Sequence, residues 1–152
     1  METLQRVMNR GDLARVLIDG SDDTPPSNGH QGAELQELNN ALVWLHKELF
    51  GRGPTKARSG YSGPDTVITT LENGLTTAER NLIALGEQRA VRESRMVLLQ
   101  ANERTFVETV ERITGRTVRA FMSGTDVQED VSAAVFCLEP GASAEAPKRG
   151  ES

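Results

Sequence analysis

The sequence is poor in the residue types that usually build catalytic and cofactor sites. Among 152 residues, aromatic side chains make up 4%, and there are one cysteine and two histidines. A single cysteine excludes an internal disulfide and a multi-cysteine metal site, and it favours a reducing, intracellular setting. The scarcity of aromatic residues argues against a deep cofactor pocket. We therefore expect neither a cofactor nor a metal ion.

Long apolar runs and excess positive charge are also missing. No stretch approaches the roughly 20 apolar residues that cross a bilayer, and the region after Met1 lacks the pattern of a signal peptide. The net charge of −5 is opposite in sign to that of a typical nucleic-acid-binding domain. These observations predict a cytoplasmic protein without an integral membrane segment, and they disfavour nucleic acid as a partner.

The sequence pattern divides the chain into one domain and three flanking segments. Apolar spacing predicts a short helical segment over residues 1–19, and Gly, Pro and short polar residues predict a flexible linker over residues 20–32. Residues 140–152 have few apolar side chains and are expected to form a disordered tail. Residues 33–139 are expected to form a single α+β domain.

Apolar periodicity and turn residues predict the elements of this domain. Leucines at helical intervals indicate a helix over residues 33–50. A capping box from Thr76 to Glu79 begins a helical pattern that ends at Gly115. Within it, residues at alternating intervals of three and four form one helical face, here called the seam. We expect one long helix here, or two that join at a bend near Gly86. Two hairpins of strands are predicted over residues 55–61, 66–71, 117–122 and 132–138.

The order helix, strand, turn, strand occurs twice. Arg58 precedes Ser62-Gly63 at the same spacing at which Arg119 precedes Ser123-Gly124. An ancient duplication and convergent hairpin chemistry both explain this echo. Either origin predicts a two-layer α+β fold, with a four-stranded, mainly antiparallel sheet built from two helix-hairpin units.

The last predicted strand is apolar on both faces. Its alternate side chains form two sets, which are Ala133, Val135 and Cys137 on one face and Ala134, Phe136 and Leu138 on the other. One layer of helices covers only one face, so we expect a homodimer in which a second copy covers the other. We assign Ala134, Phe136 and Leu138 to that interface.

Arginine dominates the basic residues, with 14 arginines against three lysines. Guanidinium groups make planar, bidentate contacts with anions. Arg89 and Arg92 occupy seam positions of the long helix where apolar residues are expected. We predict an anion-binding or partner-binding site formed by Arg58, Arg89, Arg92 and Arg119. The alternative is an interhelical or intersubunit salt-bridge network with the acidic residues that this helix carries, Glu79, Glu87, Glu93, Glu103 and Glu108.

The other reactive side chains form no catalytic motif. His46 has no second ligand at helical spacing and is expected on the surface, while His30 falls in the linker. Cys137 is expected to pack in the core. The acidic segment from Asp126 to Asp130 lacks the spacing of a calcium loop and is expected to be a solvated turn.

Several short motifs in a fixed order resemble a bacterial family. They are LFGRGP at 49–54, LTTAE at 75–79, VRE at 91–93, ITGR at 113–116 and VFCLE at 135–139. Together they resemble the MpsC-like family of unknown function, named after a proposed membrane-potential-generating system. The resemblance implies that relatives are associated with ion or bicarbonate uptake, and it implies no catalytic residues that could be transferred to this chain.

We therefore expect a non-enzymatic, self-associating accessory or regulator that binds a partner protein or a small anion, for example a membrane transport subunit. One alternative is an enzyme that holds an anionic substrate on Arg58, Arg92 and Arg119 while Tyr61 moves protons. The other is a nucleic-acid-associated regulator whose arginines gather on one face.

Overall fold

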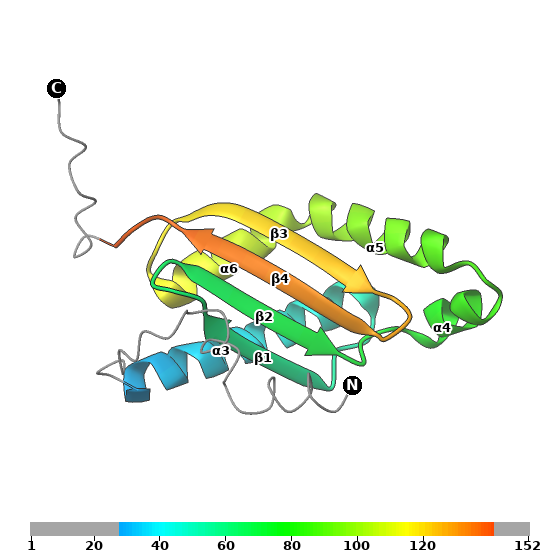
Figure 1. The fold of residues 1–152 in the computed structure, drawn as a ribbon, viewed down its shortest axis with the longest axis horizontal. Helices are drawn as coiled ribbons and strands as arrows, with labels where there is room; N and C mark the ends of the chain where they lie inside the picture. Colours follow the sequence, from blue (N-terminus) through cyan, green and yellow to red (C-terminus); the bar gives the residue numbers. More distant parts are fainter. Residues whose placement is uncertain (1–27, 142–152) are drawn as a thin grey trace, which may run out of the picture.

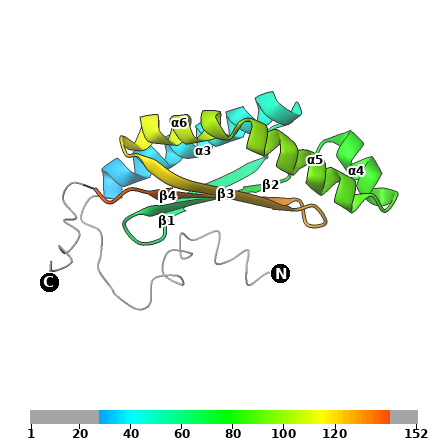
Figure 2. The same ribbon diagram turned by 90° about the horizontal axis from the view of Figure 1, so that it is seen from above.

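The computed structural model describes residues 28–141 as a layer of helices on one side of a sheet (Figures 1 and 2). The helices are α3 (Asn28–Phe50), α4 (Thr77–Ala84), α5 (Gln88–Ala101) and α6 (Glu103–Thr114). The strands are β1 (Lys56–Tyr61), β2 (Thr66–Glu72), β3 (Val118–Asp126) and β4 (Val131–Leu138). The predictions for residues 1–19, for the first part of the linker and for most of the tail lie outside the described residues.

The sheet confirms the predicted α+β class. Its four strands follow the order β1-β2-β4-β3, and every neighbouring pair is antiparallel. Each predicted hairpin forms, and the two hairpins meet through their inner strands, β2 and β4 (Figure 1). β3 extends to Asp126, beyond its predicted end. The central strands are therefore the last strand of each helix-hairpin unit.

Two equivalent hydrogen bonds join the two units at the ends of the β2–β4 pairing. The Leu138 amide donates to the carbonyl of Asp65 at 2.7 Å, and the Asn73 amide donates to the carbonyl of Asp130 at 3.0 Å. In both cases the acceptor directly precedes one inner strand and the donor lies at or just past the end of the other. The repeated order seen in the sequence is thus present as two related halves of one sheet.

Helix α3 begins at Asn28, so the predicted linker over residues 20–32 was too long. Each glycine in a helix costs about 1 kcal/mol relative to alanine, and that cost is small beside the packing of a long apolar face. Leu38 and Leu42 are fully buried on this face. The helix ends at Gly51, which takes a left-handed conformation and donates its amide to the Lys47 carbonyl.

The helical seam after Thr76 is divided into three helices. The capping box forms as predicted, since the Glu79 amide donates to Thr76 Oγ1 at 3.1 Å and the Thr76 amide donates to Glu79 Oε1 at 2.9 Å. The chain then turns at Gly86, whose φ is +83°, and it breaks again at Asn102. The expected single long helix is therefore not formed, because glycine favours this left-handed turn.

The core lies between the helices and one face of the sheet. It is built around Phe106, Phe136, Leu38 and Leu42. Phe121 stacks on both Phe106 and Phe136, with ring centroids 6.0 and 4.9 Å apart. A second, smaller cluster of Leu75, Val91 and Val127 joins α5 to the sheet end.

The interface assigned to Ala134, Phe136 and Leu138 is corrected by this packing. These side chains are 3%, 0% and 0% exposed, and they belong to the core formed with the chain's own helices. The strand is apolar on both sides, so its sequence does not say which side the helices cover. The side that no described helix covers carries Ala133, Val135 and Cys137 instead (Figure 2).

Candidate interaction surface

The face of the sheet turned away from the helices, here called the open face, presents an apolar centre. Residues directly opposite each other on neighbouring strands point to the same side of a sheet. The register places Gly60, Ile68, Val135 and Met122 in one row across the open face. Met122 is 53% exposed, and Ile68 and Val135 are partly exposed.

The remaining rows of the open face differ in charge. The row nearest the end of β2 consists of Lys56, Glu72, Val131 and Asp126. The next row consists of Arg58, Thr70, Ala133 and Gly124. Cationic residues thus lie on the edge strand β1 and an acidic residue lies on the opposite edge strand, β3. Between them the face is uncharged except for Glu72.

The structure does not bring the four predicted arginines together. Arg58 lies on β1 and Arg119 on β3, the two edges of the sheet, which are separated by roughly 14 Å at the usual strand spacing. Arg89 and Arg92 lie on α5, in the helix layer. Arg89 pairs with Glu93 at 2.7 Å within the same helix, and not in the interhelical or intersubunit network of the alternative. No common anion site results from this placement.

Arg95, which the predicted site does not include, is a buried arginine that joins several elements. Arg95 is 3% exposed and donates through Nε and Nη2 to the two carboxylate oxygens of Glu79, both at 2.6 Å. Nη2 also reaches the Gly74 carbonyl at 3.0 Å, and the guanidinium lies 4.0 Å from the centroid of the Phe50 ring. Arg95 therefore ties α5 to the start of α4 and to the end of α3.

Glu79 responds to this contact. Burial alone raises the pKa of Glu79, but the hydrogen bonds from Arg95 and from the Thr76 amide outweigh burial and hold the pKa below its ordinary value. The carboxylate is therefore ionised in the folded protein. It serves both as the partner of Arg95 and as the second half of the capping box.

His46 is buried, which corrects its expected place on the surface. It is 5% exposed, and its ring meets Phe106 edge to face at 5.4 Å. Nδ1–H donates to the Leu42 carbonyl at 2.8 Å. Burial lowers the pKa of His46, the charge of Arg95 lowers it further, and the contact with Leu42 opposes both. The ring is therefore neutral at pH 7.

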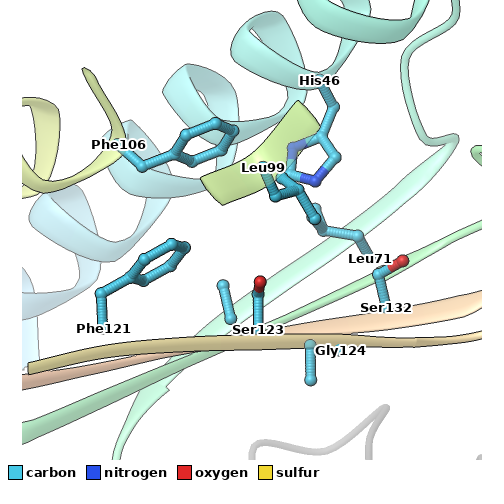
Figure 3. Close-up of a pocket in the computed structure, with 10 residues that line it drawn as sticks. His46, Leu71, Leu99, Phe106, Phe121, Ser123, Gly124 and Ser132 are labelled. Carbon is cyan, nitrogen blue, oxygen red and sulfur yellow. The ribbon is translucent and has the colours of Figure 1, made fainter. Parts of the chain in front are cut away.

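A small cavity lies below His46, between the helices and the sheet (Figure 3). Phe106 and Phe121 line one side, and Ser123 and Ser132 lie on the sheet. Its volume of about 10 Å³ holds roughly one water molecule, whereas ligand pockets enclose roughly 300 Å³ or more. The Ser132 hydroxyl is hydrogen-bonded to Thr125. The cavity is thus a packing defect rather than a substrate site.

The comparison with protein families confirms the resemblance that the sequence motifs indicated. Residues 30–140 match the family model described as "MpsC: Na+-translocating membrane potential-generating system (MpsC)". The chain belongs to the MpsC family. A relative of this MpsC-family chain is "Uncharacterized protein YrhF" from Bacillus subtilis (strain 168), 25% identical over 108 residues, which cover 70% of the chain and 88% of the relative. No solved structure gives a significant match.

In this MpsC-family chain, polar side chains that could take part in catalysis instead make hydrogen bonds that stabilise the fold. The Tyr61 hydroxyl donates to Glu34, and burial together with this bond raises the pKa of Tyr61. Asp130 accepts from the amides of Gly74 and Leu75, so it anchors the start of α4 and is more than a solvated turn. Residues 28–141 contain no group of three His, Cys, Asp or Glu side chains placed to hold a metal ion.

A second apolar surface lies at the tip formed by α4 and α5, which extends past the sheet (Figure 1). Leu82 and Leu85 are the exposed large apolar side chains of this tip, and Met96, Val97 and Leu98 are exposed farther along α5. Leu85, next to the Gly86 turn, is 77% exposed. In the described part of the chain, no helix combines the length and hydropathy that a bilayer crossing requires.

Proposed function

We propose that this MpsC-family chain is a non-catalytic accessory subunit that self-associates through the open face of its sheet. One observation carries the proposal: the central strand β4 is apolar on both sides, while the described helices lie on one side only (Figure 2). Ile68, Val135 and Met122 would lie in water in a lone copy. Contiguous apolar surface of this kind marks association sites.

The chemistry of the buried polar groups supports a binding role over catalysis. Tyr61 and Arg95 each make an intramolecular hydrogen bond that joins separate elements, and His46 bonds a carbonyl of its own helix. The separation of the predicted arginines favours a protein partner over a small anion. The family description, a Na+-translocating system, supports an accessory role beside a membrane transport subunit.

The test is the mass of the full chain in solution. At tens of micromolar, light scattering is expected to give about twice the chain mass of 16.6 kDa. Val135→Lys places a charge at the centre of the open face and is expected to leave a folded monomer, because an unpaired charge in an interface is strongly unfavourable. Circular dichroism and thermal melting check that the variant folds.

Leu85→Lys is the matched control. It removes a more exposed apolar side chain at the tip of α4 and α5, away from the open face, and it is expected to leave the dimer intact. A monomeric wild-type chain would refute the proposal. A dimer lost in Leu85→Lys and kept in Val135→Lys would move the interface to the helical tip and refute it equally.

A further inference from the structure

The strand register makes the open face complementary to itself about one particular axis. We infer that two copies pack face to face around a two-fold axis that runs parallel to the strands, between β2 and β4; this inference rests on the self-association proposed above. Rotation about that axis exchanges β1 with β3 and β2 with β4, and it keeps each residue at its level along the strands. Every residue then faces its counterpart on the exchanged strand.

The first consequence is charge pairing at one end of the face. Lys56 on β1 and Asp126 on β3 belong to the same row. The rotation therefore sets Lys56 of each copy against Asp126 of the other, which gives two equivalent ion pairs per dimer. Both side chains are exposed within a single copy, where Lys56 lies opposite Glu72 and Asp126 Oδ1 accepts from the amides of Gln128 and Glu129. Opposite charges at matched positions fix the register of an interface.

The second consequence is a fit of shapes at the centre. Met122 faces Gly60 of the other copy, and Ile68 faces Val135. A Cβ built on Gly60 meets nothing within 4 Å, so the space above this glycine is open. Met122 is the exposed large side chain of this row, and methionine adapts well to such gaps.

The alternative axis, perpendicular to the strands, is disfavoured by charge. It would place each strand over its own copy, with β1 on β1 and β3 on β3. It would also reverse the level of each residue along its strand, so that Lys56 of one copy and Asp126 of the other would lie on opposite edges. The two opposite charges would then form no pair, and the axis would lose the electrostatic complementarity that favours association.

The size of the face sets the expected affinity. Four strands about 4.8 Å apart and about seven residues long at 3.4 Å each give a face of roughly 450 Å² per copy. Standard interfaces bury about 800 Å² per partner. We therefore expect a dissociation constant in the micromolar range, which sedimentation equilibrium measures directly.

Charge reversal in the full chain tests the axis. Lys56→Glu and Asp126→Lys are each expected to weaken the dimer by about fivefold to tenfold at low salt, and the double variant is expected to restore it. Arg89→Glu, on α5 and outside the face, is the control that leaves the dimer unchanged. Melting curves check that each variant is folded.

Gly60→Leu tests the same geometry without any change of charge. Leucine fills the space that Met122 of the other copy would occupy, so the dimer is expected to weaken at least tenfold while the monomer stays folded. If Val135→Lys breaks the dimer while charge reversal shows no rescue and Gly60→Leu has no effect, self-association stands and this axis is wrong.

A chain that stays monomeric at all concentrations overturns both the axis and the proposed self-association. Cys137, on the open face, reports what happens in that case. A monomer in which a maleimide fails to label Cys137 would show that a segment of the same chain, instead of a second copy, covers this face.

Discussion

Replacing Arg95 with methionine is expected to destabilise the fold by about 3 kcal/mol, at the lower end of the 3–5 kcal/mol seen when a buried ion pair loses one partner. The change removes two charged hydrogen bonds to Glu79, the bond to the Gly74 carbonyl and the contact with the Phe50 ring. Methionine keeps most of the apolar contacts of the arginine stem.

The loss stays near the lower end because Glu79 is not wholly stranded. Its side chain is 16% exposed, so water reaches part of the carboxylate, and the Thr76 amide still donates to it. A loss of 3 kcal/mol corresponds to a fall in Tm of about 10–20 °C for a domain of this size. The effect is therefore well above the error of a melting experiment.

Urea unfolding of the wild type, Arg95→Met, Glu79→Gln and the double variant measures the coupling between the two side chains. We expect the double variant to be more stable than the sum of the single losses predicts. Arg89→Met is the control on the same helix, since Arg89 also pairs with a glutamate but its side chain is 88% exposed; no measurable change is expected there. Equal stability of Arg95→Met and Arg89→Met would refute the reasoning.

Three further predictions concern pH and backbone conformation. Because the folded-state pKa of His46 lies below its ordinary value of 6.5, protonation favours the unfolded chain, and stability falls as the pH drops below 6.5; urea midpoints at pH 7.5 and 5.5 should show this loss, with His46→Gln removing it and His30→Gln leaving it. The pKa of Glu79 is also lowered from 4.5, so its contribution is present above that pH and lost in acid, and Glu79→Gln should flatten the acid limb of the stability profile. Gly86→Ala should cost about 1–2 kcal/mol because φ is +83°, whereas Gly32→Ala within α3 should stabilise by about 0.5–1 kcal/mol; the opposite order in melting experiments would contradict the assigned turn.

Local signals in the sequence predicted the elements, and the errors came from contacts that only the fold creates. The capping box at Thr76 and the turn residues of both hairpins act within a few residues, so they could be interpreted without tertiary information. The prediction of which residues of this segment face the core was wrong, because residues spaced by three and four share one face only while the helix is continuous. The turn at Gly86 resets α5, so that Val91, Arg95 and Leu99 face the core, while Arg89 and Arg92 are exposed.

The existence of an uncovered apolar face could be predicted from the sequence, but which face it is could not. The alternation in β4 indicated two apolar faces, and the structure has helices on only one of them (Figure 2). Which face they cover depends on how α3 and α6 pack on the sheet, and that information is not in the strand. The match between Lys56 and Asp126 was also hidden, because it depends on strand order and register across all four strands.

The pairing of β2 with β4 also determines where the chain could be divided into two fragments. Each half is contiguous in sequence, and each would leave one long edge of unpaired amides and carbonyls if it were alone. Fragments severed at the exposed turn around Gly86 would therefore recombine by joining these edges, while either fragment alone would aggregate or pair with itself. The fold is therefore suited to a split-protein experiment, in which reassembly of the two fragments shows that they have bound each other.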